Sequence, residues 1–211
     1  MQLVLISPQP LTDLYGKEFP FTSVDCITRE EFLSEDLNRA DCIIDLTIEE
    51  HPDRISQYRL ATIPVLIGSV LFTLDELQID ANLPIARFNH WPTFINRNCV
   101  EFAVNRNHVE KFQQLFQTLD IPAFKTADEP GFVSARTISM IVNEAFLAKE
   151  EAVSTESEID TAMKLGTSYP MGPFEWCNKI GVERIVKLLQ KLAEKDKRYQ
   201  PAASFTQTIQ N

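Results

Sequence analysis

The first 127 positions alternate short apolar runs with polar and charged stretches. Apolar runs bounded by polar residues indicate buried strands, and they predict strands at 2–7, 24–27, 42–46, 64–67, 84–88 and 99–104. Apolar residues at helical spacing predict helices at 29–39 and 107–119, and a short helix beginning near Asp75. Strands that alternate with helices are typical of a mostly parallel sheet with helices on its faces.

After Pro130 and Gly131 the pattern is helical throughout. One buried face predicts a helix that runs to about 152, and Thr155 with Glu158 forms a capping box that opens a second helix, which Gly166 is placed to end. A third helix is expected over 182–195, and the tail 206–211 is expected to be disordered. The sequence therefore predicts two domains, an α/β domain over 1–127 and an all-α domain over 128–211.

The chain carries a formal net charge of −10 and has a pI near 4.8. Nucleic acids and anionic membranes attract basic surfaces, so neither is an expected partner. Residues 1–6 lack the charged segment and the apolar run of a signal peptide, and no stretch has the length of a membrane span. We expect a cytoplasmic protein with no membrane segment.

Cysteine and histidine residues are few and scattered. The four cysteines form no C-x-x-C pair, and His51, His90 and His108 are not spaced at i, i+4 from one another. Buried free thiols are the expected state of the cysteines, and no metal site is expected.

A series of different short motifs extends over about seventy residues of the second domain. They are Pro130-Gly131-Phe132 followed by Ser134-Ala135-Arg136, then Asn143-Glu144-Ala145, then Ile159-Asp160, then 162–166, Tyr169-Pro170-Met171-Gly172-Pro173-Phe174-Glu175, Ile180-Gly181 and finally Asp196 to Pro201. This series resembles the C-terminal domain of the 3-hydroxyacyl-CoA dehydrogenases. Residues 169–176 are interpreted chiefly as packing and dimerisation residues, since glycine and proline set turns and Phe174 and Trp176 supply apolar area.

The resemblance implies a fold and an activity. The fold would be a Rossmann-like nucleotide domain, here shortened, followed by an all-α C-terminal helical dimerisation domain, and the protein would be a homodimer. The reaction would be the NAD-linked interconversion of 3-hydroxyacyl-CoA and 3-ketoacyl-CoA. An acyl-CoA thioester is then the implied partner and NAD the implied cofactor.

The first domain departs from the family at the cofactor turn. The family places a glycine-rich turn after its first strand so that backbone amides can approach the pyrophosphate. Residues 7–12 hold no glycine here, and Pro8 and Pro10 each lack an amide proton. Asp25 is a weak candidate for the acidic residue that takes the ribose hydroxyls, and the cofactor-binding residues stay unassigned.

The family's catalytic residues carry over in part. Glu101 matches the glutamate that orients the catalytic histidine, and Ser69 and Ser134 are candidates for the supporting polar positions. An ungapped count places Asn89 at the histidine position, whereas one inserted residue would restore His90. The predicted catalytic set is therefore His90, Glu101, Ser69 and Ser134, with His90 as a loop histidine kept as the alternative.

Two polar contacts to the thioester are moved or missing, because Ser69 lies at a shifted place and Ala135 replaces the family's asparagine. If each contact contributes about 2–3 kcal/mol in the transition state, their loss costs three to four orders of magnitude in rate. The sequence predicts a divergent 3-hydroxyacyl-CoA dehydrogenase-like protein with reduced or lost activity. A non-catalytic acyl-CoA-binding or subunit-pairing homologue is the alternative, and an oxidoreductase or isomerase of a smaller substrate is a third hypothesis.

Overall fold

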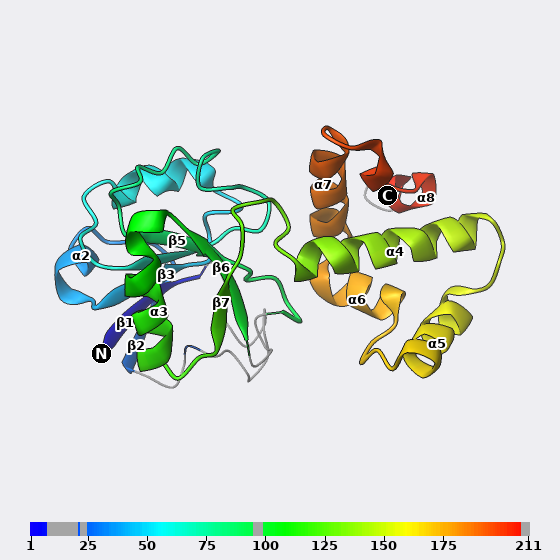
Figure 1. Ribbon diagram of the computed structural model, residues 1–211, viewed down its shortest axis with the longest axis horizontal. Coiled ribbons are helices and arrows are strands. Elements are labelled where there is room, and N and C mark those ends of the chain that lie inside the picture. The colour runs from blue at the N-terminus through cyan, green and yellow to red at the C-terminus, as the bar shows by residue number, and fades with distance from the viewer. Residues whose placement is uncertain (8–20, 22–24, 95–98, 208–211) are drawn as a thin grey trace. The chain divides into compact units, whose positions relative to one another are not determined.

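The computed structural model describes residues 1–7, 21, 25–94 and 99–207. The chain divides into two compact units, Met1–Phe132 and Val133–Asn211 (Figure 1). The division falls a few residues after the boundary expected from the sequence. The turn at 8–12 and the end of the tail, 208–211, lie outside the described residues.

The first unit is built on a seven-stranded sheet with the order β2-β1-β3-β4-β5-β6-β7. The strands β1 to β5 are mutually parallel, β6 runs antiparallel to β5, and β7 is parallel to β6. Their bounds are β1 Gln2–Ile6, β2 Asp25–Arg29, β3 Cys42–Asp45, β4 Val65–Gly68, β5 Ile85–Phe88, β6 Val100–Val104 and β7 Ala123–Lys125. This architecture confirms the predicted shortened Rossmann-like sheet.

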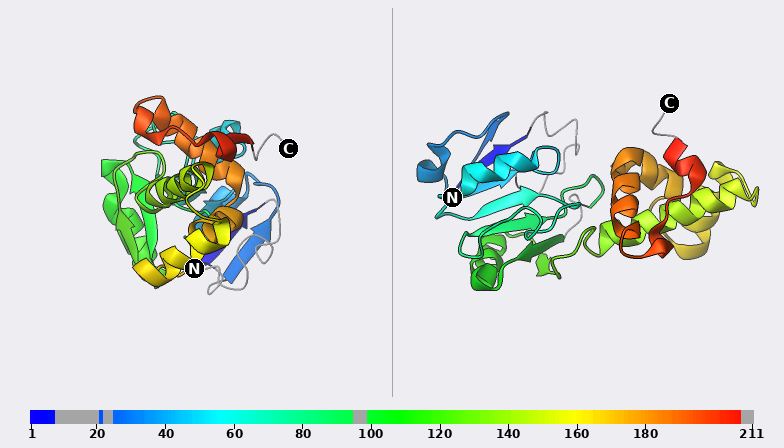
Figure 2. Two further views of the ribbon diagram at one scale, coloured as in Figure 1. Left: turned by 90° about the vertical axis from the view of Figure 1, so that its right-hand side faces the viewer. Right: turned by 90° about the horizontal axis from the view of Figure 1, so that it is seen from above.

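Alternate residues of each strand face opposite sides of the sheet. Leu3 and Leu5 of β1 join a core cluster that includes Phe112 and Phe116 of helix α3 (Val109–Thr118). Val4 and Ile6 point the other way, into a second cluster with Tyr58 of the 3-10 helix η2 (Pro52–Tyr58). Figure 2 shows α3 and η2 on opposite faces of the sheet. Both faces are therefore covered, as a parallel sheet requires.

The predicted helix over 29–39 is wrong. Strand β2 extends to Arg29, and only the short helix α2, Asp36–Arg39, follows. The buried carboxylate of Asp36 accepts a hydrogen bond from the amide of Leu33 at 3.1 Å and pairs with Arg29 at 3.3 Å. These contacts hold the intervening residues in a turn, because Asp side chains compete with helical backbone bonds.

The second unit consists of helices, as predicted. They are α4 Ser134–Glu150, α5 Glu156–Thr167, α6 Pro173–Ile180, α7 Val182–Ala193, the 3-10 helix η4 Lys197–Tyr199 and α8 Ala203–Gln207. The capping box of Thr155 and Glu158 at the start of α5 is confirmed. Gly166 does not end α5, however. Ser168, with φ of 57°, provides the left-handed C-cap instead.

No helix within the described ranges is long and apolar enough to cross a membrane. The same ranges contain no group of three histidine, cysteine, aspartate or glutamate side chains placed to hold a metal ion. All four cysteines are free thiols.

Candidate functional site

The sheet topology brings three separate segments to one edge. β4 and β5 are parallel, so Ser69 and Asn89 both follow their carboxyl ends. β6 runs the opposite way, and Glu101 near its start therefore lies at the same edge. These segments hold three of the four predicted catalytic residues.

Asn89 contacts Glu101 directly. The pairing of Arg87 with Ala103 continues beyond the strand, where the Asn89 amide donates to the Glu101 carbonyl at 3.0 Å. The two side chains consequently lie on the same face, and Asn89 Nδ2 donates to Glu101 Oε2 at 3.0 Å. Both residues are buried. This contact follows the ungapped count, in which Asn89 stands where the family has its histidine.

His90 packs against the last residue of β4. A Cβ added to Gly68 would lie only 2.7 Å from His90 Cγ, so the imidazole rests on the bare α-carbon of this glycine. The ring also lies edge-on to Phe88, with centroids 6.3 Å apart. His90 is buried at 1% exposure. The segment thus presents an imidazole beside β4 and an amide beside Glu101.

The other predicted polar residues lie in different settings. Ser69 is buried, and its hydroxyl donates to the carbonyl of Phe72 at 2.9 Å, which shapes the turn after β4. Ser134 is the first residue of α4 in the second unit. His51 is the N-cap residue of η2, and His108 precedes α3, so neither follows a strand of this edge.

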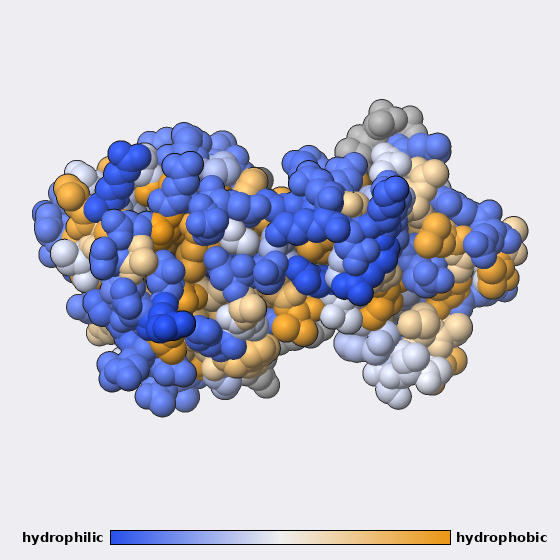
Figure 3. Space-filling model, turned by 45° about the horizontal axis from the view of Figure 1, so that its top comes forward, coloured by the Kyte–Doolittle hydropathy of each residue, from blue (hydrophilic) through white to orange (hydrophobic). Residues whose placement is uncertain are grey.

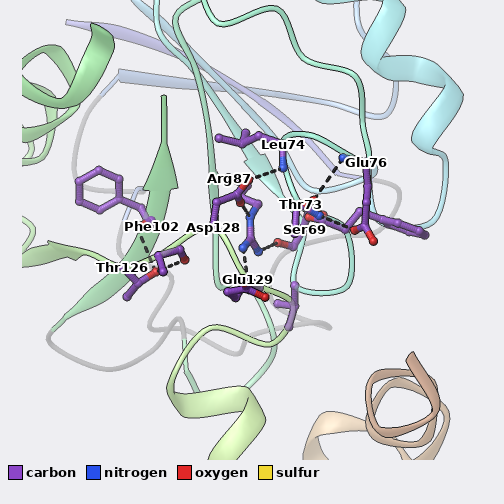
Figure 4. A network of polar contacts seen from close by, with 12 residues as sticks. Ser69, Thr73, Leu74, Glu76, Arg87, Phe102, Thr126, Asp128 and Glu129 are labelled. Atoms are coloured by element: carbon purple, nitrogen blue, oxygen red, sulfur yellow. Dashed lines mark hydrogen bonds and ion pairs between the residues drawn. The ribbon is translucent and has the colours of Figure 1, made fainter. Parts of the chain in front are cut away.

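A fully buried arginine ties this edge to the segment after β7. Arg87 pairs with Asp128 through Nε, and its terminal nitrogens donate to the carbonyls of Ser69 at 3.3 Å and Glu129 at 2.7 Å (Figure 4). Its guanidinium lies 4.2 Å from the centroid of the Phe132 ring. Burial lowers the pKa of Arg87, and Asp128 opposes that shift. The arginine therefore fixes the turn after β4 and the end of the first unit together.

Glu49 makes a second buried link at the same edge. Its carboxylate accepts from the amides of Val70 and of Leu71, the latter at 2.9 Å, and from the indole of Trp91 at 2.7 Å. Trp91 is fully buried and directly follows His90. These bonds hold the chain on both sides of the Gly68–His90 contact, and nothing in the local sequence pattern had indicated them.

A hollow of about 120 Å³ lies at the carboxyl ends of β1 and β3, and Glu31, Asp45, Arg54 and Gln57 are among the residues that line it. Both oxygens of Asp45 are already engaged, one by Thr47 and the other by the Tyr58 hydroxyl at 2.7 Å. Burial raises the pKa of Asp45, although these bonds oppose the shift.

The β1–β3 hollow is a candidate site for the ribose of NAD, the cofactor that the family resemblance implies. Its carboxylate, amide and guanidinium groups supply donors and acceptors that suit ribose hydroxyls, so they fit the sugar of a dinucleotide. Asp25, the weak sequence candidate for this role, begins β2 and is therefore at the opposite end of that strand. Two acidic residues line the hollow, and Glu31, just beyond the end of β2, is the one whose carboxylate is not engaged by Thr47 and Tyr58.

The family model for the 3-hydroxyacyl-CoA dehydrogenase C-terminal domain matches residues 131–211. Over 83 residues, 38% of this chain, it is 43% identical to the 3-hydroxyadipyl-CoA dehydrogenase of Escherichia coli. Residues 131–211 are a 3-hydroxyacyl-CoA dehydrogenase C-terminal domain. The mitochondrial hydroxyacyl-coenzyme A dehydrogenase of Rattus norvegicus is 32% identical over 103 residues, 47% of this chain. The aligned regions span only 18% and 33% of these two relatives.

A solved dehydrogenase shares the fold of most of the chain. The (S)-3-hydroxybutyryl-CoA dehydrogenase of Ralstonia eutropha superposes with a TM-score of 0.73 at 19% identity, covering 88% of this chain and 70% of that one. The 3-hydroxyacyl-CoA dehydrogenase likeness thus extends in sequence over the helical unit and in fold over the Rossmann-like sheet.

Proposed function

We propose that this chain is a divergent 3-hydroxyacyl-CoA dehydrogenase-like protein that binds an acyl-CoA thioester and has reduced or lost dehydrogenase activity. The hydrogen bond between Asn89 and Glu101 carries this proposal. A carboxamide does not take up a proton near neutral pH, so the pair supplies no general base for a substrate hydroxyl. The carboxylate is retained while the group it would orient has changed.

Any residual turnover would run through His90 with Glu101, which is the catalytic pair we predict from the sequence. His90 is at the same strand edge, and an imidazole of near-neutral pKa is the suitable base for a hydroxyl. Its ring packs against the α-carbon of Gly68 and lies edge-on to Phe88, so its position is confined. This confinement supports a slow reaction.

NAD is the proposed cofactor by resemblance to the family. When bound, it would accept or supply the hydride that the oxidation or reduction requires. Glu31 and Gln57 would hold the ribose in the β1–β3 hollow, and the chain's own Asp45 would serve only to fix Thr47 and Tyr58. Four free thiols suit a reducing compartment, in keeping with the expected cytoplasmic location.

A restored histidine tests the proposal. Asn89→His should place an imidazole against Glu101 and raise the rate of acetoacetyl-CoA reduction by NADH at least tenfold over wild type. The double variant Asn89→His, Glu101→Gln is the matched control, and it should lose that gain. A wild-type rate equal to that of an ordinary dehydrogenase would refute the proposed loss of activity.

The alternative is a non-catalytic homologue that binds acyl-CoA or pairs with another subunit. The confinement of the family-model match to residues 131–211 favours it, because Asn89, His90 and Glu101 lie outside the matched region. Under this alternative, acetoacetyl-CoA would raise the melting temperature of the protein, while the Asn89→His variant would show no reduction of acetoacetyl-CoA by NADH.

We also propose that the protein is a homodimer formed through the helical unit. Several apolar side chains of this unit are exposed, with Leu165 at 81%, Val153 at 68% and Val133 at 58%. Figure 3 shows such apolar surface among hydrophilic residues on this part of the chain. Covering it would remove apolar area from water.

Light scattering at micromolar concentration should give twice the chain mass of 24.1 kDa. Leu165→Glu should shift the protein to monomer because a carboxylate cannot be buried unpaired in the interface, whereas Leu60→Glu, an equally exposed position in the first unit, should not. A wild-type monomer would contradict the proposal.

A further inference from the structure

A larger hollow, which we call the η2 groove, lies between η2, residues 76–83 and the first residue of β5. It encloses about 350 Å³ and opens beside Ile85, at the amino end of β5, whereas Asn89 follows the carboxyl end. The groove is therefore separate from the candidate catalytic edge. Neither the family resemblance nor the proposed function gives it a role.

The floor of the η2 groove is aliphatic. Leu77 and Ile85 are buried members of the core cluster on this face, and Ile55, Ile79 and Leu83 pack against them while remaining partly exposed. The cause is the short cover over this part of the sheet. A 3-10 helix rises about 2.0 Å per residue, so the seven residues of η2 span only about 14 Å. Core side chains thus reach the surface without a helix over them.

The size and lining suit a small molecule. Binding sites for small ligands typically enclose about 300–1,000 Å³, and they combine a mainly apolar wall with a few polar groups. The volume of the η2 groove lies at the lower end of this range, and five aliphatic side chains form its floor between polar residues of the rim.

The rim is more negative than positive. It holds two acidic residues, Asp53 and Glu76, and one basic residue, Arg59. Glu76 accepts a hydrogen bond from the amide of Thr73 at 2.9 Å, whereas the carboxylate of Asp53 has no hydrogen bond or ion pair with another residue that the structure describes. The first unit as a whole is also negatively charged, because residues 1–132 hold 20 of the chain's 30 acidic residues and only 10 of its 20 basic ones. Such a field favours a cation over an anion.

We propose that the η2 groove binds a small aliphatic amine, with the alkyl chain on the floor and the ammonium group at Asp53. The alkyl group of the ligand would cover the aliphatic side chains that η2 leaves exposed. Its ammonium group would form an ion pair with the carboxylate of Asp53. Each buried methylene would strengthen binding, and the ammonium would set the preference among ligands with the same chain.

The test uses the whole 211-residue chain and three six-carbon probes, hexylammonium, 1-hexanol and hexanoate. Amide chemical shifts of Leu77, Gln78 and Ile79 should move saturably with hexylammonium, with a dissociation constant on the order of 1 mM. Hexanol should bind about threefold more weakly and hexanoate more weakly still. Butylammonium should bind more weakly than hexylammonium by about twofold per methylene lost, since the floor is only partly enclosed.

Two variants and a control locate the site. Asp53→Asn should abolish the preference for hexylammonium over hexanol, while Asp120→Asn, which removes the same charge at an exposed turn elsewhere, should keep it. Ser56→Phe should fill the groove and weaken all three probes at least tenfold. Equal binding of hexanoate and hexylammonium, or no saturable shift below 10 mM, would overturn the proposal. The proposal would also be overturned if, without ligand, the chemical shifts of the groove amides changed with protein concentration. Such changes would mean that a second copy of the chain occupies the groove.

Discussion

Gly68 shows how one missing side chain positions the candidate catalytic segment. Gly68→Ala would bring a Cβ to 2.7 Å from His90 Cγ and 3.0 Å from two further ring atoms. The ring must move, and we expect the free energy of unfolding to fall by about 1–3 kcal/mol, which is the typical cost of overpacking a core. Urea unfolding measures this cost, and the double variant Gly68→Ala, His90→Ala should recover much of it. No recovery would mean that the alanine clashes elsewhere.

Arg87 should be among the residues most important for stability. Arg87→Met would remove a donor from the carbonyls of Ser69 and Glu129 and the cationic partner from Asp128, at a cost of about 2–4 kcal/mol. Asp128 remains 29% exposed, so water offsets part of its loss. Lysine should not rescue the position, because one ammonium cannot reproduce the fork of a guanidinium. Arg39→Met, in an exposed pair with Glu35, should change stability by at most about 0.5 kcal/mol.

Asp45 gives stability a pH dependence. Its pKa is raised in the folded state, so its contribution is fully present below its ordinary pKa of about 3.9 and is lost as the pH rises through the folded value. Tyr58→Phe removes a hydrogen bond that opposes the shift, and the folded pKa should rise further. The destabilisation by this variant should therefore grow from pH 4 to pH 7, reaching about 1–3 kcal/mol in urea titrations.

Tyr169→Phe is the matched control, because the structure gives its hydroxyl no hydrogen-bond partner among the described residues. Its effect should not vary with pH. A Tyr58→Phe cost that stayed constant from pH 4 to pH 7 would contradict the linkage to Asp45.

Among the helices, α6 depends on a residue from α5. Asp160 accepts from the amides of Phe174 at 2.8 Å and Glu175 at 3.2 Å, and it thereby caps the first turn of α6. A Cβ on Gly172 would lie 2.2 Å from the Asp160 carboxyl carbon. Gly172→Ala should therefore lower the melting temperature more than Gly166→Ala, since a Cβ at Gly166 meets no atom within 4 Å. Equal effects in thermal unfolding would contradict this account.

At this scale the sequence predicts regular elements better than contacts. The long apolar runs placed β1 and β3 to β6, and the apolar stripe placed α7, because these patterns express burial directly. The pattern did not reveal β7, whose three residues are mostly exposed, or η2 and α6, which begin at prolines. Asn89 could be found by counting from Glu101, but the links of Arg87 and Glu49 join residues 18 to 42 positions apart and leave no local signal.

Across the whole molecule, charge and cofactor binding are connected. The net charge of −10 lies entirely on the first unit, where a dinucleotide with its two phosphates would bind. Together with the lack of glycines and the two prolines in the sequence of 7–12, this predicts a dissociation constant for NADH of about 0.1 mM or weaker, since each amide–phosphate bond lost would cost about 1.5–3 kcal/mol. Calorimetry that gave low-micromolar binding would show that residues 7–12 form an anion site.

The position of Asp128 near the end of the first unit has a consequence for synthesis on the ribosome. Arg87 enters the nascent chain 41 residues before the carboxylate that neutralises it, and Phe132 follows later still. Until those residues leave the exit tunnel, the guanidinium of Arg87 lacks its ion-pair partner and its contact with the Phe132 ring. We therefore expect the amino-terminal unit to acquire protease resistance only in nascent chains long enough to expose Phe132, and to stay dependent on chaperones before that point.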